Sequence, residues 1–116
     1  MLQHFFIGGE NRPFKFGFNA IDIYCRERSI TLAQFTEQLE RVGKGEALPG
    51  EIRDLIYAGL AGGALTAGLP VSFNSLTVGD WMDELTSEGI AAILKAFAES
   101  VSAPVKKKAE TQTAQL

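Results

Sequence analysis

The segment from Pro13 to Phe35 constrains the fold most, because its hydrophobic period changes within a few residues. Up to Phe16 the apolar residues alternate with other residues, which is typical of a β-strand with one buried face. After Gly17 they recur three and four positions apart, which indicates an amphipathic helix. The chain therefore passes directly from a strand into a helix, and the fold has to contain both.

The first strand of the fold is predicted at Gln3 to Ile7 and the second at Pro13 to Phe16. The intervening GGENR is typical of a hairpin loop. Because an isolated two-stranded hairpin is marginal in water, these strands have to pack on helices.

Amphipathic spacing and end signals predict about five helices after the hairpin. In the first, one face gathers the apolar Phe18, Ile21, Tyr24 and Cys25. The second has Thr31 and Gln34 at the spacing of a capping box. The third helix is predicted to start at Glu51, and the fourth has Thr77 as its predicted N-cap. The last helix has Thr86 or Ser87 as its predicted N-cap and carries an apolar stripe from Ile90 to Val101.

The third predicted helix, from Glu51 to Leu65, carries glycine at positions 59, 62 and 63. Each glycine inside a helix costs about 1 kcal/mol relative to alanine. The second half of this helix is therefore either closely packed against a neighbour or frayed.

Length and composition favour one globular domain. The chain has 116 residues, of which 46% are hydrophobic and 22% charged, values that exclude a wholly disordered protein. We expect a mostly helical α+β domain over residues 1–102, with the N-terminal hairpin packed on the helices. From residue 103 to 116 no hydrophobic periodicity remains, which predicts a disordered tail.

The charge distribution argues against nucleic-acid binding. Residues 1–104 carry 8 Lys and Arg against 13 Asp and Glu, whereas binding to phosphates needs clustered basic side chains. No apolar run approaches the roughly 18 residues that span a bilayer, and the N-terminus lacks the pattern of a secretory signal. We expect a cytoplasmic protein that does not bind a membrane.

No arrangement of residues indicates catalysis, a cofactor or a metal. His4 is the only histidine and Cys25 the only cysteine, so neither a disulfide within the chain nor a cysteine-based zinc site can form. The acids at 80, 83, 84 and 88 are typical of a solvated helix face. The protein is therefore interpreted as no enzyme, unless a cleft gathers His4, Tyr24 and these acids.

Partner contact is predicted for a few large apolar residues, because tryptophan and methionine are favoured at binding surfaces as well as in cores. For Trp81 both the core role and the contact role stay open. The predicted contact residues are Phe73, Trp81, Met82 and Phe97.

The order of these pieces resembles the tail assembly chaperones of long-tailed bacteriophages and related prophages, over about residues 5–101. The matching segments are FKFGFNAIDIYCRERSITLAQF, IRDLIYAGLAGG, SLTVGDWMDEL and IAAILKAFAES. The glycine-rich AGGALTAGLPVSFN departs from the family pattern, because it is more elaborate than the short loop expected there.

The resemblance implies a non-enzymatic helper that binds the tape measure protein while tail tube subunits polymerise, and that is absent from the finished virion. It also implies a tail tube protein as a further partner. Because several apolar helical stripes need covering, we also expect that a homo-oligomer can form. Many members have a longer form made by ribosomal frameshifting, and the lysines at 106–108 fit an adenine-rich slippery sequence as well as a solubilising tail. The alternative function is a bacterial adaptor or regulatory domain that binds a helix and has no link to phage.

Overall fold

The protein is described by a computed structural model that covers the backbone of residues 2–115 and side chains up to Val101. The described part is a mostly helical α+β fold, which confirms the predicted fold class. Its elements are β1 (Gln3–Ile7), β2 (Glu10–Phe14), α1 (Phe18–Arg28), α2 (Leu32–Gly43), α3 (Pro49–Thr66), α4 (Ser75–Met82) and α5 (Ser87–Gln115).

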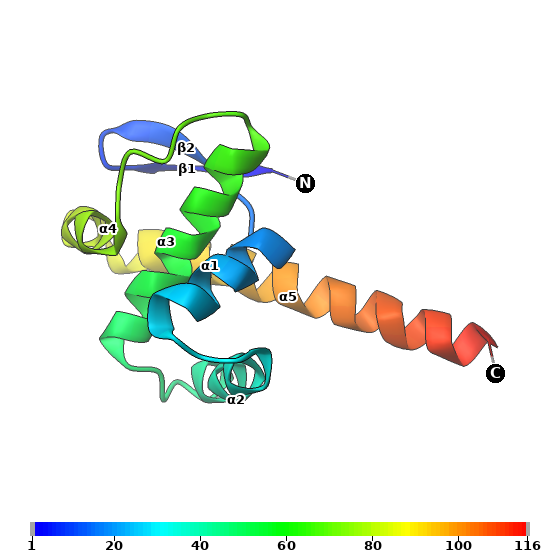
Figure 1. Cartoon of the computed structure of the whole chain (residues 1–116). Helices are drawn as coiled ribbons and strands as arrows, with labels where there is room; N and C mark the ends of the chain where they lie inside the picture. The colour runs from blue at the N-terminus through cyan, green and yellow to red at the C-terminus, as the bar shows by residue number, and fades with distance from the viewer. Residues whose placement is uncertain (1, 116) are drawn as a thin grey trace.

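Helix α3 lies at the centre of the molecule (Figure 1). It contacts β2, α1, α4 and α5. The hairpin lies near one end of α3 and α2 near the other, while α5 runs past the back of the body in this view. The hairpin is thus one of several elements that cover a single central helix.

The hairpin closes through a two-residue turn at Gly8 and Gly9, whose φ angles are +64° and +79°. Both values lie in the left-handed region that glycine adopts without strain, as a two-residue hairpin turn requires. The strands are antiparallel, and Ile7 pairs with Glu10. The predicted loop GGENR is therefore wrong in part, because its last three residues belong to β2, which ends at Phe14.

The glycines of α3 allow the end of β2 and the residue after it to lie directly on the helix. A Cβ at Gly63 would come within 2.3 Å of the Pro13 carbonyl oxygen, and one at Gly59 within 2.2 Å of the Phe14 ring. The Lys15 N–H donates a hydrogen bond of 3.0 Å to the carbonyl of Gly59. Close packing, rather than fraying, is therefore the reason for these glycines.

Aromatic side chains from distant segments meet in the core. The Phe16 ring meets the Phe97 ring edge to face, with centroids 4.7 Å apart. It also stacks with the Phe35 ring at 6.2 Å. The Phe97 side chain is only 3% exposed, so it joins α5 to the body.

The ends of two helices show which predicted caps are right. The Thr31 and Gln34 capping box at the start of α2 is confirmed. The predicted N-cap at Thr77 is wrong, because the Asn74 side chain accepts a hydrogen bond of 2.9 Å from the Thr77 N–H. Helix α4 therefore begins three residues earlier than the sequence indicates, at Ser75 with Asn74 as its N-cap.

The predicted disordered tail concerns residues 103–116. The backbone of α5 extends to Gln115, and the side chains from residue 102 onward lie outside the described part of the structure. The tail and the domain limit at 102 therefore stay predictions. Among the residues that the structure describes, no helix is both long and apolar enough to cross a membrane.

Candidate interaction surface

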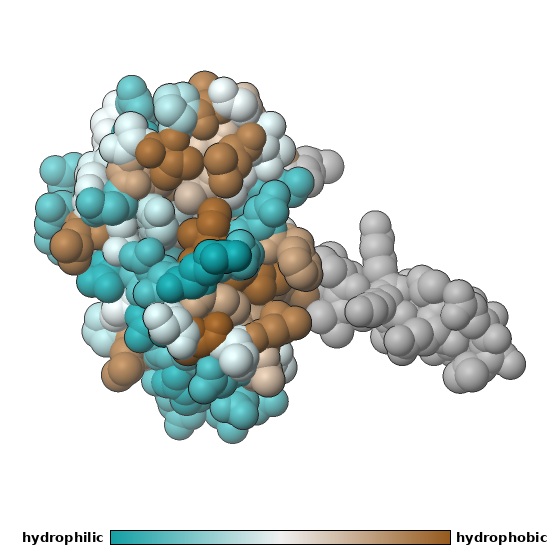
Figure 2. All heavy atoms as spheres, in the orientation of Figure 1, coloured by the Kyte–Doolittle hydropathy of each residue, from teal (hydrophilic) through white to brown (hydrophobic). Residues whose placement is uncertain are grey.

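Apolar side chains gather on the surface at the end of α3. Leu65 is 54% exposed and Leu69 is 50% exposed. Leu69, Pro70 and Phe73 also line a shallow depression of about 70 Å³ beside the hairpin. Figure 2 shows hydrophobic atoms over this part of the molecule. We call Leu65, Leu69, Pro70 and Phe73 the α3-loop surface.

The backbone that carries the two leucines is fixed by the way α3 ends. The Leu69 N–H donates to the Ala64 carbonyl at 2.8 Å, and the Gly68 N–H donates to the Leu65 carbonyl at 3.2 Å. These two bonds, with φ +73° at Gly68, form a Schellman motif. The backbone around the exposed leucines is therefore fixed by local hydrogen bonds.

Phe73 connects this surface to the core. Its ring meets the Tyr57 ring edge to face at 6.0 Å and the Trp81 ring at 5.4 Å. Because the residue is partly buried and also lines the depression, it anchors the loop and contributes to the surface. Phe73 is the predicted contact residue that lies on the α3-loop surface.

The Trp81 side chain packs α4 against the hairpin. The Arg12 guanidinium lies over its ring, 4.1 Å from the centroid. A Cβ at Gly8 would come within 2.4 Å of the same ring, so the turn of the hairpin rests on the indole. Arg12 also donates a hydrogen bond of 2.9 Å to the Ile7 carbonyl. Trp81 thus has a packing role within the chain.

The remaining two predicted contact residues also pack within the chain. Met82 is partly buried against the core. Phe97 is 3% exposed, so in this conformation its ring offers no surface to a partner. Leu65 and Leu69 are not among the predicted contact residues, because they flank a helix end where the apolar residues do not define a helical face.

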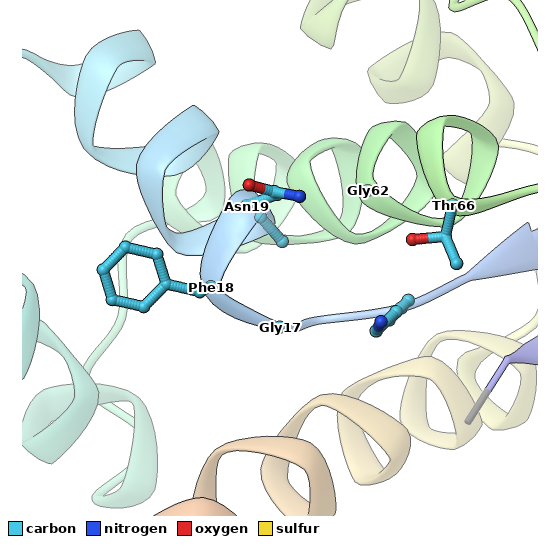
Figure 3. A pocket seen from close by; sticks show the side chains of 7 residues that line it. Gly17, Phe18, Asn19, Gly62 and Thr66 are labelled. Atoms are coloured by element: carbon cyan, nitrogen blue, oxygen red, sulfur yellow. The ribbon is translucent and has the colours of Figure 1, made fainter. Parts of the chain in front are cut away.

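A second pocket, of about 180 Å³, lies between the start of α1 and α3. In Figure 3, Asn19 and Thr66 flank it and the Phe18 ring points away from it. Phe18 is 78% exposed, which contradicts its predicted place on the buried face of α1. Lys15 is the one ionisable side chain that lines this pocket, so the pocket offers no acid and base pair.

The residues that catalysis would need lie apart from both pockets. Neither pocket is lined by His4, by Tyr24 or by the acids from 80 to 88. His4 is exposed on β1, whereas Tyr24 is buried. Among the side chains that the structure describes, no three metal-ligating groups come together.

Comparison of the chain with protein-family models, with curated proteins and with solved structures finds no match. A function therefore has to be argued from the residues and the surface of this chain.

Two acidic side chains of α3 are buried in the interior of the molecule. Glu51 is 2% exposed and Asp54 is 3% exposed. Arg28 pairs with Asp54 at 2.7 Å and Arg41 pairs with Glu51 through two hydrogen bonds. These pairs join α3 to α1 and α2. Neither ion pair is predicted from the sequence, because acidic residues near the start of a helix are ordinarily solvated.

Tyr24 lies beside these ion pairs. Its hydroxyl donates a hydrogen bond to the Gln38 side chain of α2. Burial raises the pKa of Tyr24 to about 12, and the neighbouring Arg28 partly offsets that effect. The hydroxyl therefore stays protonated at neutral pH and serves as a donor between two helices.

Acid is expected to weaken the fold through Glu51. Burial alone would raise its pKa, but the hydrogen bonds from Arg41 and from the Leu48 N–H outweigh burial and lower the pKa below 4.5. A lowered pKa stabilises the folded state at pH values above the unfolded pKa, and this contribution is lost as the pH falls through the folded pKa. The urea midpoint of the wild type should fall more between pH 7 and pH 3 than that of Glu51→Gln.

The matched control for this prediction is Glu37→Gln, which changes an exposed acid of α2. Its urea midpoint should follow the wild type at both pH values. Equal acid losses in the wild type and in Glu51→Gln would show that the buried pair contributes nothing to the pH dependence.

Proposed function

We propose that this protein is a phage tail assembly chaperone. It binds the tape measure protein in the host cytoplasm, aids assembly of the tail tube, catalyses no reaction and is absent from the mature virion. The order of the sequence motifs supports this proposal. The observation that carries it is the exposed pair Leu65 and Leu69 on a fixed backbone.

The exposed leucine pair suits reversible capture of an apolar helix. Fully burying a leucine side chain contributes about 1.5–3 kcal/mol, so covering the exposed half of each leucine contributes about 1 kcal/mol. Leu65 and Leu69 are about half exposed, and Phe73 and Pro70 extend the same surface. A contact of this size holds a client weakly and releases it when the tail tube polymerises around it.

The segment with the exposed leucines also departs from the family pattern. Leu65 and Leu69 both lie in AGGALTAGLPVSFN, where this chain has a more elaborate connection than the family. We interpret this segment as the place where the chain is adapted to its own tape measure protein. The tail tube protein is the further partner proposed for the chain, and oligomers of the chain are part of the same proposal.

Co-expression with a tape measure fragment tests the function and its surface together. The wild-type chain is expected to raise the soluble yield of the fragment several-fold, and the double variant Leu65→Ser, Leu69→Ser is expected to lose most of that gain. The reason is that serine removes the apolar area that the client would cover. Soluble and pelleted fragment are compared by gel densitometry after lysis.

Leu48→Ser is the control, because Leu48 is 59% exposed at the opposite end of α3, about 25 Å away. It should retain the gain. A fragment that is no more soluble with the wild type than alone would overturn the chaperone assignment. A gene neighbourhood without tail genes would favour the adaptor function instead.

A further inference from the structure

Helix α2 is attached to the body by little buried surface. Its one fully buried side chain is Phe35, whereas α3 buries eleven residues. In Figure 1 it lies at the edge of the molecule, beyond α1 and the start of α3. Such an element opens at low cost compared with a central helix.

The Phe35 ring packs in a cluster of three aromatic rings that come from other parts of the chain. Its ring lies 5.5 Å from the Tyr24 ring and 6.2 Å from the Phe16 ring, and Phe16 in turn contacts Phe97. We call Phe16, Tyr24 and Phe97 the aromatic seat. Each of these three side chains is nearly fully buried while α2 is in place. Departure of α2 would expose an apolar face between α1 and α5.

Beside the aromatic seat, an ion pair also holds α2 on the body. Arg41 binds the buried carboxylate of Glu51 with both of its terminal nitrogens, yet the Arg41 side chain is 42% exposed. A buried carboxylate is stable only when it is paired or reaches water. A helix that replaced α2 would therefore bind best if it supplied its own cation to Glu51.

The connections on both sides of α2 each contain a residue with a positive φ. Ser29, before α2, has φ +55°, and Gly45, after it, has φ +75°. Each of these residues closes a helix end through local hydrogen bonds, from the Ile30 N–H to the Cys25 carbonyl and from the Glu46 N–H to the Arg41 carbonyl. A change in the direction of α2 therefore has to occur in the few loop residues beyond these caps.

We propose that α2 is a displaceable helix that covers the aromatic seat, and that the seat accepts an amphipathic client helix with an aromatic side chain followed six residues later by an arginine. This pattern copies Phe35 and Arg41 of α2 itself. The identity of the client rests on the proposed function, whereas the displacement of α2 does not.

Hydrogen exchange of the full-length chain tests the displacement. Amides of α2 are expected to exchange at least tenfold faster than those of α3 between Leu55 and Gly63. Arg41→Ala should raise exchange in α2 a further tenfold, and the amides of α3 should stay at least tenfold slower than those of α2, because α2 opens without unfolding of the whole domain. The control Arg26→Ala, which breaks an exposed pair with Asp22 on α1, should change neither helix.

The opposite pattern would overturn the proposal. If α2 and α3 exchange at the same rate in the wild type or in Arg41→Ala, α2 opens only when the whole domain unfolds. Gln38→Ala is a second variant, since it removes the acceptor for the Tyr24 hydroxyl and leaves the Glu51 pair in place. It should also raise exchange in α2 and leave α3 at least tenfold slower than α2.

A fluorescent peptide of residues 31–46 tests the seat, by anisotropy. It should bind the Arg41→Ala chain at least tenfold more tightly than the wild type, because the variant exposes its seat more often and keeps Glu51. A peptide with Phe35→Ala should lose binding to both chains. Equal affinities for the two chains, or no binding to either, would contradict the seat.

These results separate the two proposals. Peptide binding without any gain in tape measure solubility would reject the chaperone function and keep the displaceable helix. A solubility gain together with uniform exchange of α2 and α3 would reject the displaceable helix and keep the chaperone function.

Discussion

Phe97→Ala is expected to lower the free energy of unfolding by about 3–5 kcal/mol, as truncation of a buried phenylalanine does elsewhere. The side chain is 3% exposed, and its ring meets the Phe16 ring at 4.7 Å, so the substitution leaves a cavity between α5 and the linker after β2. Urea unfolding followed by circular dichroism measures the change. The slope of the transition should stay the same while the midpoint falls.

Phe18→Ala is the matched control, because Phe18 is 78% exposed. An exposed substitution of this kind changes stability by less than about 0.5 kcal/mol. Losses of equal size in the two variants would contradict the position of Phe97 in the core and with it the packing of α5 on the body.

Gly63→Ala is expected to destabilise the fold by about 1–3 kcal/mol. Helix propensity alone would favour alanine by about 1 kcal/mol. The added Cβ, however, would lie 2.3 Å from the carbonyl oxygen of Pro13. We expect the overpacking against this backbone to outweigh the gain in helix propensity and to leave a net cost of about 1–3 kcal/mol. The sign of the change in stability therefore tests whether Pro13 lies directly against α3.

Gly43→Ala is the control for this second prediction. Gly43 is the last residue of α2, and a Cβ there would meet no atom within 4 Å. This variant should be neutral or stabilised by up to about 1 kcal/mol. Thermal unfolding of both variants gives the comparison, and a stabilised Gly63→Ala would contradict the close contact.

The hydrophobic period identified most of the fold. The alternation before Gly17 and the helical spacing after it predicted the order of strand and helix that the structure has. The spacing of Thr31 and Gln34 predicted the start of α2, because a capping box is a local interaction. Local signals of this kind need no knowledge of the tertiary contacts.

Features that depend on tertiary contacts were missed or left open. The packing of Gly59 and Gly63 could not be told from fraying, because the deciding neighbours, Pro13 and Phe14, lie some 45 residues away in the sequence. The side chain of Phe18 is exposed although its spacing places it with Tyr24, because α3 covers only one side of α1. Glu51 is buried because Arg41 comes from another helix.

The interaction surface was predicted in part. Residue type alone selected Phe73, Trp81, Met82 and Phe97, but residue type does not separate a core position from an exposed one. The indole of Trp81 is engaged by Arg12, which no sequence pattern indicates. Leu65 and Leu69 were overlooked because they lie on either side of the Schellman motif that ends α3, where no helical face is defined.

The central claim is that this chain holds an apolar helical client on an exposed surface. Light scattering from a purified tape measure fragment, followed while the chain is added, measures this most directly. The proposed function predicts that the wild type suppresses aggregation at about equimolar ratio and that the double variant Leu65→Ser, Leu69→Ser does so much less. Aggregation that proceeds unchanged in the presence of the wild-type chain would contradict the claim.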